Sequence, residues 1–229
     1  MTRKLALLPL VALAACGSGG KDPIVQAALD EMGGGLWHRQ APAGPPPKQV
    51  TRADIEKANV AAITARLESD KSPTLMFAAS SNGNYVTYSS PLQQQVTLHG
   101  AAQITGTRAL GTDLLSAWSS GPDPLASAIP PARWPARVKR VYELPGEGPQ
   151  GQIETFECSF ERPVPAEMTI LQVRYTGVNI SEDCSGPSGS FENLHFVDAS
   201  TGTVRRSLQW TGPKMELLDL QIIEPYTGG

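Results

Sequence analysis

The segment TLMFAASSNGNYVTYSS, residues 74–90, places two runs of strand-forming residues on either side of Asn82-Gly83. An Asn-Gly pair readily adopts the positive φ angles of a two-residue hairpin turn, and the Tyr, Val and Thr residues beside it favour extended backbone. This segment therefore predicts a β-hairpin, and the strand pattern that begins here sets the class of the fold.

Further short runs repeat the pattern towards the C-terminus. QQVTLHG and QITGTRAL predict a second hairpin that turns at Gly100, and DASTG predicts a tight loop in which Gly202 is available for positive φ. Together with the runs that follow Ala136, they amount to roughly ten strands. We therefore expect an all-β fold, mainly an antiparallel barrel or strongly curved sheet, with one or two N-terminal helices.

The helical signals precede the strands. Asp22-Pro23 is a suitable N-cap and first-turn pair for a short helix over PIVQAALDEM. Thr51 followed by Asp54 resembles a capping box, and the spacing of apolar residues after it predicts a second helix that runs to about Ser69. GTDLLSAWSSGPDPLASAIPPARW lacks alternation, so we expect a connection with one or two short helical turns.

The N-terminus begins MTRKLALLPLVALAAC, in which Arg3 and Lys4 precede an apolar run over residues 5–15. That run is too short for a membrane-spanning helix, which needs about 20 apolar residues, and it has the length of a signal peptide. Leu-Ala-Ala-Cys closely resembles the bacterial lipobox, which implies cleavage before Cys16 and acylation of its sulfur and new amine, palmitate being a usual acyl group. The alternative is an ordinary secretory signal with Cys16 incidental.

Three segments follow from these signals: a lipoprotein signal peptide over 1–15, a lipidated tether with a short helix and a Pro-rich spacer over 16–50, and one β-rich domain over 51–229. Removing residues 1–15 changes the formal charge from −3 to −5, because Arg3 and Lys4 are lost. A mildly acidic chain with scattered cations offers no footprint for nucleic acid. Acyl chains on Cys16 would make the membrane a partner, and Gly17 rather than an acidic residue after it favours the outer membrane.

Cys158 and Cys184 remain as the other two cysteines. Both lie in or beside strand-like runs that could be neighbours in an antiparallel sheet, and an exported chain with two thiols in an oxidising compartment favours a disulfide between them. Two separate buried thiols are the alternative. We expect no metal site, because His38, His99 and His195 share no ligand spacing with the cysteines or with one another.

The sequence contains no recognisable catalytic set and no cofactor-binding motif, so we expect no catalytic residues and no cofactor. There is no Gly-x-Ser-x-Gly elbow, P-loop or GxGxxG. His195 falls within a strand pattern, where a structural role is the usual one. Glu182 and Asp183 are interpreted as solvated loop charges, and nothing places two carboxylates across a cleft as glycoside hydrolysis requires.

Tryptophans and a local basic cluster are the candidate contacts for a glycan or a partner. Trp118 and Trp134 have flat faces that suit the C–H surface of a sugar ring, although packing in the core or at a barrel rim is the alternative that we favour for them. Arg133 belongs with Arg137, Lys139 and Arg140 to a basic cluster around Trp134, for which a solvated strand face is the alternative.

Several motifs in order resemble the group 4 capsule polysaccharide lipoproteins of the GfcB/YjbF type. The resemblance runs from Thr51 to the C-terminus and rests on a G-x-x-x-T-x-x-L-G-x-D-L stretch, a D-P-L motif, an Arg-Trp pair and a V-D-x-x-T-G-x-V-R hairpin. In this chain they are carried by Gly100 to Leu114, Asp123-Pro124-Leu125, Arg133-Trp134 and Val197 to Arg205. The resemblance implies a barrel-like β fold in a lipoprotein of exopolysaccharide or capsule production and export. Cys158 does not belong to the family pattern, so the disulfide rests on the two-thiol argument.

Three functional hypotheses follow. The first is a non-enzymatic, periplasm-facing lipoprotein of the outer membrane that assists capsule or exopolysaccharide export by docking to export proteins or holding the glycan. The second is a lipid or lipoprotein carrier with an enclosed apolar cavity. The third is a polysaccharide-modifying enzyme. A filled interior with a broad surface patch would favour the first, an apolar cavity the second, and paired carboxylates in a polar cleft the third.

Overall fold

The computed structural model describes residues 50–70, 72–146, 151–215 and 217–228. In this part of the chain one short α-helix precedes a sheet of antiparallel strands, which confirms the expected fold class. The elements are α2 (Arg52–Ala58), β1 (Ala62–Leu67), β2 (Thr74–Asn82), β3 (Tyr85–Ser89), β4 (Gln95–His99), β5 (Gln103–Arg108), β6 (Ser116–Ser120), a 3-10 turn (Pro131–Arg133), β7 (Arg137–Leu144), β8 (Gln152–Phe160), β9 (Val164–Ile170), β10 (Val173–Gly186), β11 (Gly189–Val197), β12 (Val204–Gln209) and β13 (Leu218–Glu224).

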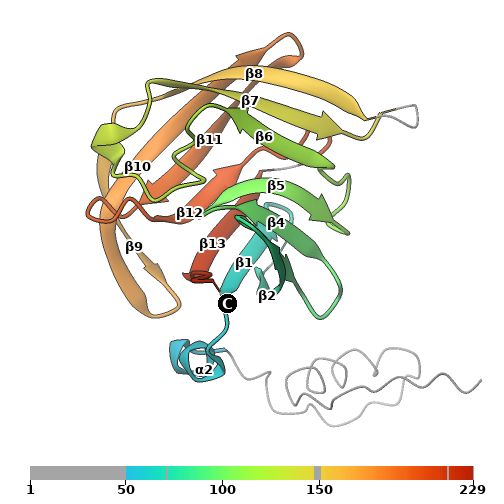
Figure 1. The fold of residues 1–229 in the computed structure, drawn as a ribbon. Coiled ribbons are helices and arrows are strands. Elements are labelled where there is room, and N and C mark those ends of the chain that lie inside the picture. The colour runs from blue at the N-terminus through green and yellow to red at the C-terminus, as the bar shows by residue number, and fades with distance from the viewer. Residues whose placement is uncertain (1–49, 71, 147–150, 216, 229) are drawn as a thin grey trace, which may run out of the picture. The chain divides into compact units, whose positions relative to one another are not determined.

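The strands form a single sheet in the order β5-β4-β3-β2-β1-β13-β12-β11-β10-β8-β7-β6, with β9 paired to β10 outside this path. The sheet curves until its two end strands, β5 and β6, lie side by side, so that the barrel is nearly closed (Figure 1). One side-chain contact across this seam is the hydrogen bond from Gln103 Nε2 to Ser119 Oγ, at 3.1 Å. Curvature of this kind leaves few free strand edges.

The hairpins lie where the turn residues predict them. Gly83-Asn84 joins β2 to β3, one residue later than the predicted Asn82-Gly83 turn, because Asn82 still pairs with Tyr85. Gly100 lies between β4 and β5, and Gly202 lies between β11 and β12. Asp198 accepts hydrogen bonds from the backbone N–H groups of Ser200 and Thr201, which explains why its loop is tight.

The predicted helix over residues 51–69 is wrong in its second half. Thr51 caps α2 through a capping box with Asp54, but the helix ends at Ala58, and Asn59 adopts the left-handed conformation. The segment that follows is β1, in which Ile63 and Ala65 face the barrel core while Ala62 packs on the other side of the sheet with Ile55. Residues 63–67 alternate between apolar and polar side chains, but the run is short, and Ile63 and Leu67 also have helical spacing, so the sequence fits both structures.

The predicted connection over residues 111–134 is also partly wrong, because it contains strand β6 before a single short helical turn. The segment 121–130, which we call the plug loop, lies across one end of the barrel. Leu125 of this loop is fully buried in the core, and its carbonyl accepts a hydrogen bond from Ala102 N at 2.8 Å. A Cβ atom at Gly100 would lie only 1.7 Å from Ala126 O, so the loop packs directly against the β4–β5 turn.

Side chains fill the inside of the barrel. One continuous hydrophobic cluster draws on most of the strands, from Ile63 in β1 to Ile222 in β13, and includes Leu125 of the plug loop. Four rings, those of Tyr142, Phe156, Phe191 and Trp210, pack on one another at centroid distances of 4.5–6.0 Å. A second, smaller cluster on the outside of the sheet joins Ile55 of α2 to Ile170 and Ile223.

The proposed signal peptide, Cys16, the helix over PIVQAALDEM and almost all of the Pro-rich spacer lie outside the described residues. These expectations therefore stay predictions. No described helix has both the length and the apolar character needed to cross a bilayer.

Candidate functional site

The three residues predicted to contact a glycan or a partner take different positions. Trp118 lies in β6 and is 41% exposed. Trp134 is half-buried, donates its indole N–H to Ile129 O at 2.7 Å, and packs edge-on against Phe160. Arg133, at the end of the 3-10 turn, is exposed. Trp118 is thus partly open to solvent, whereas the ring of Trp134 packs its loop against the sheet.

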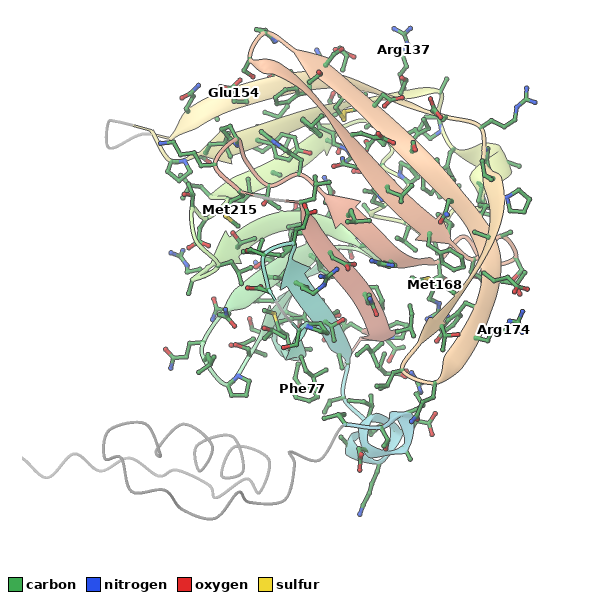
Figure 2. The ribbon with its side chains drawn as sticks, turned by 180° about the vertical axis from the view of Figure 1, so that it is seen from behind. Phe77, Arg137, Glu154, Met168, Arg174 and Met215 are labelled. Atoms are coloured by element: carbon green, nitrogen blue, oxygen red, sulfur yellow. A yellow bond between two sulfur atoms is a disulfide. The ribbon has the colours of Figure 1, made fainter. Side chains whose placement is uncertain are left out.

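Trp118 stands on the outer face of the barrel. It pairs with Val141 of β7, and the neighbouring pair Ser119 and Arg140 points inward, because successive residues of a strand face opposite sides. The same outer face continues through Arg137 and Lys139, which are exposed between buried neighbours in β7. In Figure 2 the side chain of Arg137 projects away from the barrel.

A shallow polar groove of about 480 Å³ lies on this face over β7, β8, β10 and β11. We call it the outer groove, and six of its lining residues are Arg137, Glu157, Ser159, Asp183, Ser190 and Glu192. The strand register places them in rows across the sheet: Arg137 opposes Ser159, which opposes Asp183, which opposes Glu192. The groove therefore offers hydroxyl, carboxylate and guanidinium groups side by side.

The outer groove and Trp118 are adjacent through β7. Ser120 of β6 opposes Lys139 of β7, which opposes Glu157 in the groove and forms an ion pair with it at 3.2 Å. Trp118 and Ser120 are two residues apart on β6, so their side chains point to the same face, about 7 Å apart along the strand. An aromatic platform and a row of polar groups therefore share one continuous surface.

A disulfide between Cys158 and Cys184 lies directly beneath this surface. The two residues oppose each other in β8 and β10, with Cα atoms 4.0 Å apart, and both are almost fully buried. Because the cross-link joins two strands of the sheet beneath the groove, it fixes the register of the groove's central rows. Glu182 lies near enough to both cysteines for a metal ion, but sulfurs bonded to each other cannot act as thiolate ligands.

A charged network lies on the inner side of the same strands. The Nε atom of Arg140 donates to Glu182 Oε1 at 2.5 Å, and its Nη1 atom donates to Asp123 Oδ2 at 2.7 Å. Arg140 is on β7, Glu182 on β10 and Asp123 in the plug loop, and each is at most 6% exposed. The guanidinium thus connects two strands of the barrel to the loop that covers its end.

Glu182 is held by three donors. Its second oxygen, Oε2, accepts from Asn193 at 2.8 Å and from His195 Nε2 at 3.1 Å, which assigns the imidazole proton to Nε2. Burial alone would raise the pKa of Glu182, but the charge of Arg140 and the hydrogen bonds from His195 and Asn193 outweigh it and hold the pKa at about 2. A carboxylate that is fully buried and already accepts hydrogen bonds from three side chains does not act as a general acid or base near neutral pH.

The sequence interpretation of these charges is partly wrong. Glu182 is not a solvated loop charge but a fully buried residue in β10, and Arg140 is not part of a solvated strand face. Both follow the alternation of their strands: Arg140 has the parity of the buried Val138 and Tyr142, and Glu182 that of Ile180 and Cys184. The alternation of each strand was therefore the sequence signal that could have identified both as inward-facing residues. Arg133, Arg137 and Lys139 are exposed, as expected.

Comparison with known proteins adds the family context. A family model described as group 4 capsule polysaccharide lipoprotein gfcB, YjbF matches residues 25–223. No curated protein matches the chain. The crystal structure of the hypothetical lipoprotein YmcC from Escherichia coli (K12) is similar, with a TM-score of 0.66 and 18% sequence identity over 92% of this chain and 98% of that chain. At this identity the similarity establishes a shared fold.

Proposed function

Because the chain belongs to the YjbF family of group 4 capsule polysaccharide lipoproteins, we propose that it is a non-enzymatic accessory of capsule or exopolysaccharide production and export. In this proposal Cys16 is acylated and anchors the chain in the outer membrane, with the barrel in the periplasm. The family model supports the lipoprotein character and the connection with capsule polysaccharide. The place and mode of action are our inference.

The observation that carries the mode of action is the outer groove beside Trp118. Sugar rings have apolar C–H faces that pack on an indole and hydroxyl groups that donate to carboxylates such as Asp183 and Glu192. The groove is open and mixed in charge, so it suits an extended, hydroxyl-rich polymer or a polar partner surface better than a hydrocarbon chain. Because the core cluster fills the barrel, this proposal is preferred to the carrier hypothesis.

Deletion of the gene tests the role, and complementation tests the site. We expect deletion to reduce surface polysaccharide and the wild-type gene to restore it. Trp118→Ala should restore it poorly although its product folds, because the side chain is exposed and its loss leaves no cavity in the core. Leu92→Ala is the matched control, since Leu92 is an apolar residue, 56% exposed, in the β3–β4 connection.

Two results would count against the proposal. Unchanged polysaccharide in a clean deletion strain would remove the role itself, and full complementation by Trp118→Ala would remove the outer groove from it. The anchor is tested separately: the mature N-terminus should have the mass of an acylated Cys16 without residues 1–15, and Cys16→Ser should release the protein from the membrane.

A further inference from the structure

A second groove, of about 480 Å³, opens at the end of the barrel where the plug loop lies. We call it the mouth groove, and six of its lining residues are Asn84, Val86, Tyr88, Thr203, Arg205 and Ile222. They come from the turn before β3, from β3 itself, from the start of β12 and from β13. Neither the charged network nor the outer groove includes any of them.

The mouth groove has fixed walls. Gly202, at the turn before β12, lies so close to the plug loop that a Cβ atom there would be 2.3 Å from Ile129 C. The side chains of Val86, Tyr88 and Ile222 are buried in the barrel and form an apolar floor. On the far side, Tyr226 is held by a hydrogen bond of 3.0 Å from its hydroxyl to Ser81 Oγ. A site with preformed walls binds without a large ordering cost.

Arg205 gives the mouth groove its charge. Within the described part of the chain its Nε atom is buried without a hydrogen-bond partner, and no carboxylate forms an ion pair with it. The adjacent Arg206 differs, because its Nε and Nη2 atoms donate to Asp219 at 2.7 and 2.8 Å. The guanidinium of Arg205 is nevertheless held in place, since its Cζ atom lies 4.8 Å from the centre of the Tyr175 ring.

An oriented guanidinium without a carboxylate partner is suited to bind an anionic group through paired N–H donors. The apolar floor beside it suits a C–H face, and Asn84 and Thr203 can exchange hydrogen bonds with hydroxyl groups. A uronic acid combines these three features in one ring. We propose that the mouth groove binds a carboxylated sugar unit, with its carboxylate on Arg205 and its ring over Val86 and Ile222.

The choice of a saccharide rests on the proposed role in polysaccharide production, whereas the anionic group follows from Arg205 alone. The V-D-x-x-T-G-x-V-R motif also acquires a double purpose. Its Asp198 and Gly202 build the turn and seat the plug loop, and Arg205 at its end supplies the binding charge.

Calorimetry on the full-length protein in detergent tests the proposal with three probes: tetragalacturonate, its methyl ester, and inorganic phosphate. We expect the tetragalacturonate to bind and the ester to bind at least about tenfold more weakly, because the ester keeps the sugar but lacks the charge. Phosphate should bind more weakly than tetragalacturonate. Equal binding of acid and ester, or equal binding of phosphate and tetragalacturonate, would overturn the proposal.

Variants locate the site. Arg205→Gln should remove most of the preference for the acid, and Arg108→Gln, an exposed arginine of β5, should leave it unchanged. Ala128→Glu places a carboxylate on an exposed position of the groove wall and should weaken binding of the acid without a change in the core, so the proposal stays testable if Arg205→Gln fails to fold. Undiminished binding by a folded Arg205→Gln or by Ala128→Glu would contradict it.

The two proposals fail separately. Trp118→Ala should leave tetragalacturonate binding intact, because Trp118 is not part of the mouth groove. If tetragalacturonate binds through Arg205 but deletion of the gene leaves surface polysaccharide unchanged, the binding site stands and the proposed role falls. If deletion reduces polysaccharide but the protein shows no preference for the acid, the role stands and the binding site falls.

Discussion

Arg140→Met tests most directly how the barrel is held together. The substitution keeps the length and most of the volume of the side chain but removes the guanidinium that Glu182 and Asp123 share. Because these carboxylates are 0% and 6% exposed, water cannot replace the lost donors. The variant therefore leaves two buried acids with an incomplete set of partners.

Removing one partner of a buried ion pair costs about 3–5 kcal/mol, because the remaining charge stays buried without compensation. We expect at least this loss here, since one guanidinium serves two acids. For a domain of this size 1 kcal/mol corresponds to a shift of about 2–4 °C in the melting temperature, so the variant should melt about 6–20 °C below the wild-type protein.

Thermal unfolding followed by circular dichroism at neutral pH measures this shift, with urea unfolding for the free energy. Arg137→Met is the control, because Arg137 lies on the same strand with its side chain in solvent, and its melting temperature should stay within about 2 °C of the wild-type value. Adding Glu182→Gln to Arg140→Met should recover part of the loss by removing one stranded charge. A melting temperature for Arg140→Met as high as that of Arg137→Met would refute the reasoning.

Three further predictions concern pH, the cross-link and the plug loop. Glu182 has a folded-state pKa of about 2 against its usual 4.5, so its contribution to stability is complete above pH 4.5 and is lost as the pH falls towards 2. Between pH 4.5 and 2 the free energy of unfolding should therefore fall more steeply with pH for the wild type than for Glu182→Gln. Equal slopes would contradict this assignment. Replacing Cys158 and Cys184 together by alanine should lower the free energy of unfolding in urea by about 3–4 kcal/mol, as expected for a cross-link across 26 residues, and an unchanged midpoint would show that the cross-link contributes nothing. Gly83→Ala and Gly100→Ala both place alanine at a φ near +60°, but only the Cβ atom at position 100 would meet the plug loop. Gly100→Ala should therefore lower the melting temperature more than Gly83→Ala does. Equal effects would mean that the loop is not packed as described.

The sequence predicted the local turns because their signals are local. Gly83, Gly100 and Gly202 each mark a hairpin through the positive φ angles that glycine tolerates, independently of the rest of the chain. The number of short strands between these turns was enough to predict the fold class. The family resemblance, which the family model confirms, rests largely on the same turn-forming positions.

The segment 60–69 was misread because two periods fit it. Ile63 and Leu67 are spaced for a helix, and Ile63 and Ala65 are spaced for a strand. Pairing with β2 and β13 decides the outcome, and β13 lies so far along the chain that no local propensity can indicate it. Tertiary pairing therefore overrode a weak helical pattern.

The charged network was missed for a different reason. Sequence interpretation assigns an acidic or basic residue to solvent because an unpaired charge is costly to bury. Arg140 and Glu182 compensate each other, but they are 42 residues apart, and nothing in either segment identifies its partner. The sequence could not predict the mouth groove for the same reason: Arg206 has a carboxylate partner in Asp219 of β13 and Arg205 has none among the described residues, a difference that only the folded structure shows.

The pairing of β1 with β13 has a consequence for how the chain reaches this fold. Ala62 lies opposite Glu224, so the first described strand, β1, pairs with the last, β13. The meander β1–β5 contacts the rest of the sheet through this pair and through the β5–β6 seam. Contacts of such long sequence separation slow folding, because a large loop must close before they form. A chain that lacks β13 leaves one edge of β1 without a partner, so we expect chains cut short before β13 to stay open and to aggregate through that edge.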